Sequence, residues 1–327
     1  MTTLPQPEPT FDPDALLASL PGFACGELPD WGLIRAEGPE AMAFLQAQLS
    51  NDLNAVSRQQ AQLSGYCSAK GRLLTVLTVS RLDREGSYGL ELPTELLAAS
   101  LKRLRMYLLR SKLSLDDVSA SLPALALAGR EASARLQQLG LPVPEGALAC
   151  AWDGDLQISR RPGDWPRFLL RAPPERLHAL RKRLDTATPL DHRHWHLAEL
   201  LAGIPVVRSE TVEHFVPQTV DLDLAGGISF SKGCYPGQEI VARVHYLGRL
   251  KQRLHLGFCD APAAPGSAIY ADGESGQAVG EVMDSAPLPD GRQALALSLN
   301  LSHGDHPRLH LGRADGPRLS GLRPSHR

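Results

Sequence analysis

Short strand-like runs that alternate with amphipathic helical runs constrain the fold of this 327-residue chain more than any other feature. The strand-like runs, rich in apolar and β-branched residues, are 32–38, 64–82, 87–92, 125–130 and 168–173. The helical runs, each with one apolar side, are 39–53, 93–110, 131–140, 174–186 and 194–207. Hairpin-like turns such as Lys70-Gly71 separate the short strands, which favours antiparallel pairing. We therefore predict an α+β fold of antiparallel sheets layered with helices, rather than a doubly wound parallel sheet.

The texture of the sequence changes after Ile240. Short strand-like runs separated by Gly, Pro and Asp turns follow at 241–248, 250–259, 278–286 and 293–299. This pattern predicts a small all-β barrel. We expect three parts: a flexible arm over 1–26, which is rich in proline and acidic residues, a region of two intertwined α+β domains over 27–248, and the barrel over 249–327.

The composition excludes several classes of function. Lys and Arg number 34 against 36 Asp and Glu, so a formal net charge of -2 provides no global attraction to nucleic acid or to anionic lipid. The sequence lacks the basic and apolar regions of a secretory signal and has no run of about 20 apolar residues. We therefore expect a cytoplasmic protein with no membrane partner and no strong direct binding to nucleic acid. Neither GxGxxG nor GxxxxGK[ST] occurs, which argues against a nucleotide-binding fold.

Five cysteines are scattered along the chain without a CxxC pair. An odd, dispersed set is typical of reduced thiols rather than of a disulfide framework. Only Cys234 lies in a stretch with the features of a site, the octapeptide KGCYPGQE over 232–239. This octapeptide ends a long irregular segment, 208–239, and long irregular segments inside compact proteins are usually functional.

The octapeptide has the chemistry of a reactive-thiol loop. Gly233 and Gly237 permit tight backbone and close approach of a ligand, and Pro236 stiffens the turn. Lys232 places a cation two residues before Cys234, and a nearby ammonium lowers the pKa of a thiol. The alternative is a plain turn that carries an incidental cysteine, and the loop's chemistry alone leaves both interpretations open.

Three histidines alternate at His192, His194 and His196. On a strand they would share a face and could bind a metal, whereas in a helix alternate residues do not converge. We favour the helix, with the histidines at the surface, and predict no metal site. A basic group on the run 93–110 is similarly more typical of a solvated helix face than of an RNA-binding patch; its members are Lys102, Arg103, Arg105 and Arg110.

Trp31 and Trp195 are two of only four tryptophans, and each lies beside a predicted element boundary. An indole can stack on a flat heteroaromatic ligand, or it can fill a hydrophobic core. The residue types alone favour the core.

Residues 215–254, which include KGCYPGQE, closely resemble the signature region of the YgfZ family. Residues 30–53, 66–74 and 194–207 match that family in the same order, so the resemblance covers most of the chain from about Trp31 to Arg253. Members are folate-binding proteins linked to iron–sulfur cluster assembly or repair and to tRNA modification. The resemblance implies a working thiol at Cys234.

The wider relatives are the T-proteins of the glycine cleavage system, which are tetrahydrofolate-dependent aminomethyltransferases. The resemblance implies their architecture: three domains in a ring around a folate channel, with ferredoxin-like antiparallel sheets and a C-terminal β-barrel. In those enzymes an acidic residue stands where this chain has Cys234. A thiol does not suit the same proton transfers or amine binding, so we do not expect aminomethyl transfer here.

The resemblance also assigns residues to a tetrahydrofolate site. Trp31 and Trp195 correspond to tryptophans associated with folate, which reverses the preference for core, and Asn51 and Asp52 match a stretch near the pterin. Lys232 and Arg243 are candidates for holding the anionic glutamyl tail. The remaining predicted binding residues belong to the loop and the residues after it: Tyr235, Gly237, Gln238 and Glu239.

The function predicted from the sequence is a folate-dependent accessory protein for iron–sulfur enzymes, including those that modify tRNA. Cys234, with Lys232 beside it, would act on the client, and the softness of a thiolate suits sulfur or iron ligation. The alternatives are a one-carbon transferase that uses tetrahydrofolate and a direct RNA-binding module. The near-neutral charge weakens the RNA-binding alternative.

Overall fold

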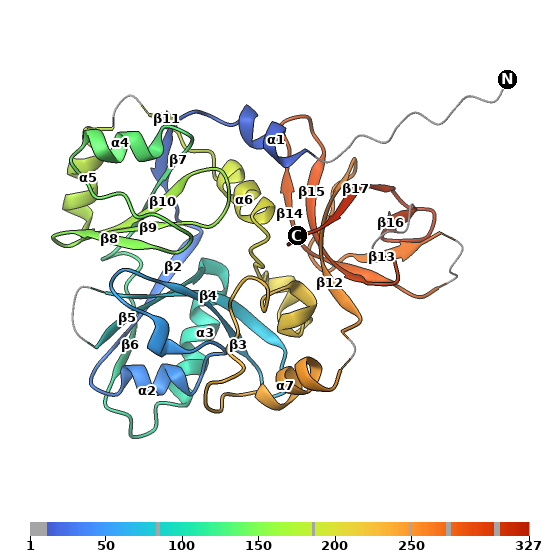
Figure 1. Ribbon diagram of the computed structural model, residues 1–327, viewed down its shortest axis with the longest axis horizontal. Coiled ribbons are helices and arrows are strands. Elements are labelled where there is room, and N and C mark those ends of the chain that lie inside the picture. The colour runs from blue at the N-terminus through green and yellow to red at the C-terminus, as the bar shows by residue number, and fades with distance from the viewer. Residues whose placement is uncertain are drawn as a thin grey trace.

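The computed structural model describes residues 12–82, 86–184, 187–248, 250–272, 276–303 and 308–326. Figure 1 shows three lobes, each built on one β-sheet. The strand pairs in these sheets are antiparallel except for one parallel pair, β1 with β11, in the described part of the chain.

The first sheet has five strands in the order β3-β4-β5-β2-β6. Its strands are β2 (Trp31–Glu37), β3 (Gln62–Cys67), β4 (Leu73–Arg81), β5 (Ser87–Pro93) and β6 (Ser114–Asp117). The hairpin between β3 and β4 turns at Gly71, whose φ of 67° is accessible to glycine at little cost. The predicted hairpin over 64–82 is therefore confirmed.

Two helices accompany the first sheet: α2 (Ala41–Gln46) and α3 (Thr94–Met106). Leu97 of α3 packs directly over Gly32, where a Cβ would lie 2.3 Å from its Cδ1. The apolar side of α3, which includes Leu101 and Leu104, faces the core. Burying a leucine side chain in this way stabilises the fold by about 1.5–3 kcal/mol.

The second sheet has six strands in the order β11-β1-β7-β10-β9-β8. Its strands are β1 (Ala24–Glu27), β7 (Ala124–Ala128), β8 (Cys150–Asp153), β9 (Leu156–Arg160), β10 (Arg167–Arg171) and β11 (Thr188–Pro189). The helices α4 (Ala132–Gln138) and α5 (Pro174–Lys182) lie on its outer side in Figure 1. Leu136 of α4 and Leu177 of α5 are buried in one cluster with Phe168 of β10, so both helices are held by apolar packing.

The third sheet has six strands in the order β16-β13-β14-β15-β12-β17. Its strands are β12 (Gln252–Cys259), β13 (Ala268–Ala271), β14 (Gly280–Pro287), β15 (Gln293–Asn300), β16 (Leu309–Leu311) and β17 (Leu319–Pro324). A bridge between His310 and Arg318 brings the two edges of this sheet together at one point. The sheet therefore curls into the barrel-like form that the sequence predicts for the C-terminal region.

Helix α6 (His192–Leu201) lies near the centre of Figure 1, where the lobes meet. Residues 208–237 follow with little regular structure apart from two 3₁₀ turns, η2 (Ser209–Thr211) and η3 (Pro217–Val220). Helix α7 (Gln238–Tyr246) then leads to the third sheet. The short elements α1 (Pro13–Ser19) and η1 (Leu53–Ala55) complete the fold.

The α+β class with antiparallel sheets is confirmed. The strand predicted over 241–248 is wrong, because these residues belong mainly to α7, which buries Val241. The flexible arm predicted over 1–26 needs correction in part. Residues 1–11 lie outside the described residues. Helix α1 lies within 12–26, and β1 begins there, ends at Glu27 and pairs with β7. The domain boundaries at 27 and 249 stay predictions. None of the helices in the described ranges has the length and hydropathy to cross a lipid bilayer.

Candidate functional site

The octapeptide Lys232–Glu239 packs closely against the turn between β3 and β4, and the two backbones meet at Gly237 and Gly71. Gly237 is the N-cap of α7 with φ of 81°, and a Cβ there would lie 2.4 Å from the carbonyl oxygen of Ser68 and 2.6 Å from Cα of Gly71. A Cβ on Gly71 would in turn lie 2.7 Å from Cβ of Ile240. Both positions also have a positive φ. Glycine is therefore required at each of them for two reasons, the backbone conformation and the lack of space for a Cβ.

Lys232 points into the protein at the end of α2. Its side chain is only 8% exposed, and its ammonium donates to the carbonyl oxygens of Gln46, at 2.5 Å, and of Leu49. The C-terminal carbonyls of a helix attract a cation, so this contact anchors the loop. Burial lowers the pKa of Lys232 from 10.5 to about 8, although the carboxylate of Asp52 opposes the shift.

Cys234 is exposed, whereas the other four cysteines are buried. Burial raises the pKa of Cys25 to about 11 and that of Cys67 and Cys150 to about 12, and it also raises the pKa of Cys259. Thiols held protonated in apolar surroundings are inert. Cys234 is therefore the accessible sulfur among the five cysteines, while its role as a working thiol stays a prediction.

The remaining loop residues divide between anchoring and exposed positions. Tyr235 is buried, and the ammonium of Lys232 lies 5.1 Å from the centre of its ring. Gln238 is half-buried on α7, while Glu239 and Arg243 are exposed on the same helix. The predicted contact of Arg243 with a glutamyl tail stays a prediction.

A buried glutamine that the sequence reasoning missed ties α7 to η3. The Nε2 atom of Gln218 donates to the carbonyl oxygen of Val241 at 2.7 Å. Its position in the mainly apolar stretch FVPQTV, residues 215–220, was the available signal, since a glutamine buried in such a stretch must find an internal partner.

Asn51 and Asp52 lie close to the anchor of Lys232. The Nδ2 atom of Asn51 donates to the carbonyl oxygens of Leu63 and Gly226, each at 2.8 Å, so this amide joins β3 to the irregular segment. Asp52 Oδ1 accepts from Gln46 Nε2 at 2.9 Å. The structure therefore brings Asn51, Asp52 and Lys232 together, while their role toward a pterin stays a prediction.

Each predicted folate tryptophan lies under an arginine. The guanidinium carbon of Arg161 is 5.4 Å from the centre of the half-buried Trp31 ring, and that of Arg167 is 5.2 Å from the buried Trp195 ring. Trp31 lies on β2 and Trp195 on α6, so two lobes and the central helix contribute to one arrangement. A guanidinium over an indole is a favourable cation–π contact, stronger when it is shielded from water.

These arginines belong to a buried group of charges that the sequence reasoning missed, here called the ionic cluster: Glu91, Arg161, Arg167, Arg171 and Glu199. The cluster holds three positive and two negative charges, which leaves one positive charge in excess. The sequence signal was Glu199 on the apolar side of a predicted helix, since a carboxylate at such a place must be paired.

The chemistry of this region fits a folate heterocycle. The Nε1 atom of Trp195, Nε of Arg167 and Oε2 of Glu199 are buried and lack hydrogen-bond partners among the described residues. A pterin edge carries both acceptors and donors, which would complement two free donors and one free acceptor. The binding of tetrahydrofolate at Trp31 and Trp195 stays a prediction.

Other candidates from the sequence lie apart from one another. His192 pairs with Asp30 at 3.1 Å and His196 with Asp284 at 2.7 Å, both from α6. No three His, Cys, Asp or Glu side chains in the described ranges are grouped as metal ligands. Arg105 on the basic side of α3 pairs with Asp116 at 3.3 Å.

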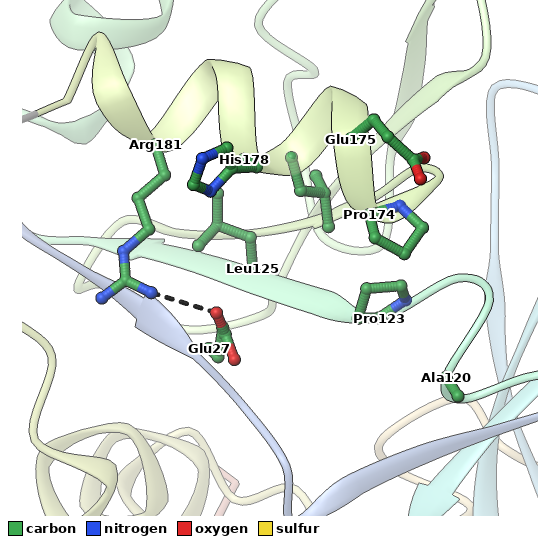
Figure 2. Close-up of a pocket in the computed structure, with 9 residues that line it drawn as sticks. Glu27, Ala120, Pro123, Leu125, Pro174, Glu175, His178 and Arg181 are labelled. Carbon is green, nitrogen blue, oxygen red and sulfur yellow. Dashed lines mark hydrogen bonds and ion pairs between the residues drawn. The ribbon is translucent and has the colours of Figure 1, made fainter.

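A separate pocket of about 510 Å³ lies beneath α5, away from the octapeptide. Figure 2 shows Arg181 of α5 paired with Glu27 of β1, at 3.0 Å, at one end of it, and Glu175 at the other end. The floor is apolar and includes Leu125 of β7. Because its rim carries charges of both signs, the pocket does not specify one class of ligand.

Comparison with solved structures supports the fold. The aminomethyltransferase T of the glycine cleavage system from Bartonella henselae has a TM-score of 0.76 with this chain. The two are 18% identical, and the match covers 96% of this chain and 90% of the other. The similarity confirms the predicted T-protein-like architecture.

Sequence comparison identifies the family, although no protein-family model matches the chain. A protein of Colwellia psychrerythraea named tRNA-modifying protein YgfZ is 30% identical over 301 residues, 90% of each chain. A protein of the same name from Sodalis glossinidius is 31% identical, and the match covers 87% of each chain. Another from Serratia proteamaculans is also 31% identical, and the match covers 84% of this chain and 83% of the other. With such identity over nearly its whole length, and with a T-protein-like fold around the KGCYPGQE loop, the chain belongs to the YgfZ family.

Proposed function

We propose that this protein is a cytoplasmic, folate-binding accessory factor for iron–sulfur cluster assembly or repair, and that it supports tRNA modification through enzymes that carry such clusters. The observation that carries the proposal is the accessible thiol of Cys234 on a loop that is anchored on both sides. Lys232 holds the loop to α2, and Gly237 holds it to the β3–β4 turn. A flexible surface thiol would not require such anchoring.

Each residue of the site would have a separate role. Cys234 would present sulfur to a client protein as a transient ligand for iron or sulfur. Trp31 and Trp195 would hold tetrahydrofolate, which supplies a reduced pterin able to carry one-carbon units. Arg167 and Glu199 would meet the polar edge of the ligand. The clients are iron–sulfur enzymes, and the net charge of -2 supports contact with them rather than strong direct binding to RNA.

The thiol role is tested by complementation of a deletion strain. We expect Cys234→Ala to fold and to bind folate, yet to leave the activity of cluster-dependent tRNA-modifying enzymes near the level of the deletion. Gly233→Ala is the matched control, because a Cβ at Gly233 meets nothing within 4 Å and this variant should rescue fully. Full rescue by Cys234→Ala would remove the thiol from the mechanism.

Folate binding is tested by calorimetric titration with tetrahydrofolate. Trp31→Leu should bind at least about tenfold more weakly than wild type, since about 1.4 kcal/mol of stacking and burial is lost. Trp152→Leu is the control, because Trp152 lies on β8 with its ring against Arg58 and outside the ionic cluster. An absence of heat with the wild-type protein would contradict the folate proposal.

The second candidate function is a tetrahydrofolate-dependent one-carbon transferase, which the aminomethyltransferase-like fold favours. It requires an acceptor group beside the folate, whereas an exposed thiol stands in the loop where the related enzymes have an acid. Incubation with folate labelled in its one-carbon unit distinguishes the two functions. Transfer of label to an amine acceptor would support the transferase, and retention of all label on folate would support the accessory role.

A further inference from the structure

Glu199 contacts both arginines that lie over the predicted folate tryptophans. Its Oε1 atom accepts from Nε of Arg161 at 2.9 Å and lies 3.0 Å from Nη1 of Arg167. Arg161 is over the ring of Trp31, and Arg167 is over the ring of Trp195. One carboxylate oxygen therefore connects two indoles that are 164 positions apart in the chain.

The two arginines depend on Glu199 to different degrees. Arg161 also pairs with Glu91 at 2.8 Å, so it retains a carboxylate if Glu199 loses its charge. In the described part of the chain, Glu199 is the carboxylate paired with Arg167, whose Nη2 atom otherwise donates to the carbonyl oxygen of Pro162 at 2.6 Å. Removing the charge of Glu199 should therefore displace Arg167 most, and Trp195 with it.

Stability alone does not account for the ionic cluster. Glu199 is 1% exposed, and the cluster contains an excess positive charge and several unpaired polar atoms, each of which costs about 1–3 kcal/mol. Buried ion pairs can often be replaced by apolar residues with no loss of stability. Nη1 of Arg167 lies 3.0 Å from Oε1 of Glu199, so the attraction between the two charges orients the guanidinium.

We propose that Glu199 is a positioning residue that fixes Trp31 and Trp195 relative to each other, through Arg161 and Arg167. The proposal rests on the proposed function only in naming tetrahydrofolate as the ligand that uses this geometry. This role is separate from the contact that Glu199 would make with the ligand, and it does not require tetrahydrofolate to be bound. Binding at one tryptophan then depends on the state of the other, because both are held by the same carboxylate.

The first test needs no ligand. The protein is labelled with 5-fluorotryptophan, and its four tryptophan resonances are assigned by single Trp→Phe variants. Glu199→Gln should shift the fluorine resonances of both Trp31 and Trp195 and leave that of Trp152, which lies against Arg58, in place. Glu131→Gln is the control, since it removes the charge of an exposed glutamate that pairs with Arg135. Unchanged resonances for Trp31 and Trp195 would overturn the proposal.

The second test is a double-mutant cycle on tetrahydrofolate affinity with Trp31→Phe and Trp195→Phe. In the wild-type background, the combined loss should differ from the product of the two single losses by about threefold or more. In the Glu199→Gln background, the two losses should multiply. Independent losses in the wild-type background would overturn the coupling.

The two tests separate the failure of this proposal from the failure of the proposed function. If the protein binds no tetrahydrofolate, the proposed function is contradicted. The fluorine spectra still show whether Glu199 positions the tryptophans. If Glu199→Gln does not fold, Arg167→Lys takes its place, and the proposal then requires that the Trp195 resonance shifts and that the wild-type cycle shows coupling.

Discussion

Gly237 has a far more restricted environment than Gly233, the other glycine of the octapeptide. It combines a φ of 81° with backbone atoms that would lie 2.4–2.7 Å from a Cβ. A flexible side chain could move out of the way, but the carbonyl of Ser68 and the backbone of Gly71 cannot. The backbone of the loop, more than its side chains, therefore determines where Cys234 is presented.

We expect Gly237→Ala to lower the free energy of unfolding by more than about 2 kcal/mol, because it adds both backbone strain and a steric clash. Gly233→Ala provides the comparison within the same loop, since its Cβ would enter open space. Urea denaturation measures both variants. Equal stability of the two would show that the loop does not rest on the β3–β4 turn.

Lys232 should give the protein an unusual dependence on alkaline pH. Its pKa is lowered from 10.5 to about 8 by burial, so between these values the unfolded chain binds a proton that the folded chain has released. The contribution of Lys232 to the free energy of unfolding therefore rises with pH across this window, by at most about 3 kcal/mol.

The measurement compares wild type with Lys232→Met by urea denaturation at pH 7.5 and pH 10. Other groups titrate in this range, but they are common to both proteins and cancel in the difference. The stability of wild type relative to Lys232→Met should increase at the higher pH. A constant difference would contradict the lowered pKa.

At the scale of elements, α6 supplies both Trp195 and Glu199, so its start must be well defined. Asp191 caps this helix by accepting from the backbone N–H of Arg193 at 2.9 Å. Hydrogen bonds from the Arg193 side chain, with this backbone contact, lower the pKa of Asp191 from 3.8 to about 2.

Asp191→Ala should cost about 0.5–2 kcal/mol at neutral pH, whereas Asp191→Asn, which can still cap, should cost a few tenths. Because the folded pKa is lowered, the contribution of the charge is present above pH 4 and is lost as pH falls toward 2. Thermal unfolding followed by circular dichroism at pH 7 and pH 2.5 measures both effects. A difference between wild type and Asp191→Ala that persists in full at pH 2.5 would argue against capping by the carboxylate.

The sequence predicted some elements well because their signals are local. The hairpin of β3 and β4 follows from two apolar runs around Lys70-Gly71, and α3 follows from its amphipathic period. Helix α7 was mistaken for a strand because its β-branched residues Val241 and Val244 suit either structure. Two features favour the helix. Gly237, directly before α7, is its N-cap, and Gln218, which lies 23 residues earlier in the sequence, donates to the carbonyl of Val241.

At the scale of the whole molecule, a buried carboxylate joins the third sheet to the centre. Asp284 of β14 accepts from Nε of Arg208 at 3.0 Å and lies 2.7 Å from Nε2 of His196 on α6. The side chain of Asp284 is only 4% exposed, so its two partners are the main compensation for its buried charge. The joint therefore couples the stability of the barrel-like sheet to that of α6.

Asp284→Ala should lower the free energy of unfolding by about 3–5 kcal/mol, because it leaves Arg208 without this carboxylate in a partly buried place. Asp290→Ala, in the same sheet region, removes a carboxylate that is 49% exposed and pairs with Arg292, and it should cost less than about 1 kcal/mol. Thermal unfolding is monitored by limited proteolysis, which distinguishes unfolding of the whole chain from release of the third sheet alone. Similar melting of the two variants would contradict the role of Asp284 as a joint.

The ionic cluster shows the limit of prediction from one sequence. Glu91, Arg161 and Glu199 belong to different lobes or to the central helix, and no local pattern indicates that their side chains meet. The octapeptide and both tryptophans could be proposed as site residues because they lie in stretches that resemble a family. The cluster that contacts the tryptophans could be found only from the folded chain.

The contact between Gly71 and Gly237 joins two positions that are 166 residues apart. Neither glycine can acquire a side chain while the other loop keeps its present course. Over evolutionary time the two turns should therefore change together: a relative that has a larger residue at one position should carry a rebuilt turn at the other. Paired substitution at these two sites can be sought in any set of related sequences. Such pairs would show that the contact between the two turns is maintained to hold the loop that carries Cys234.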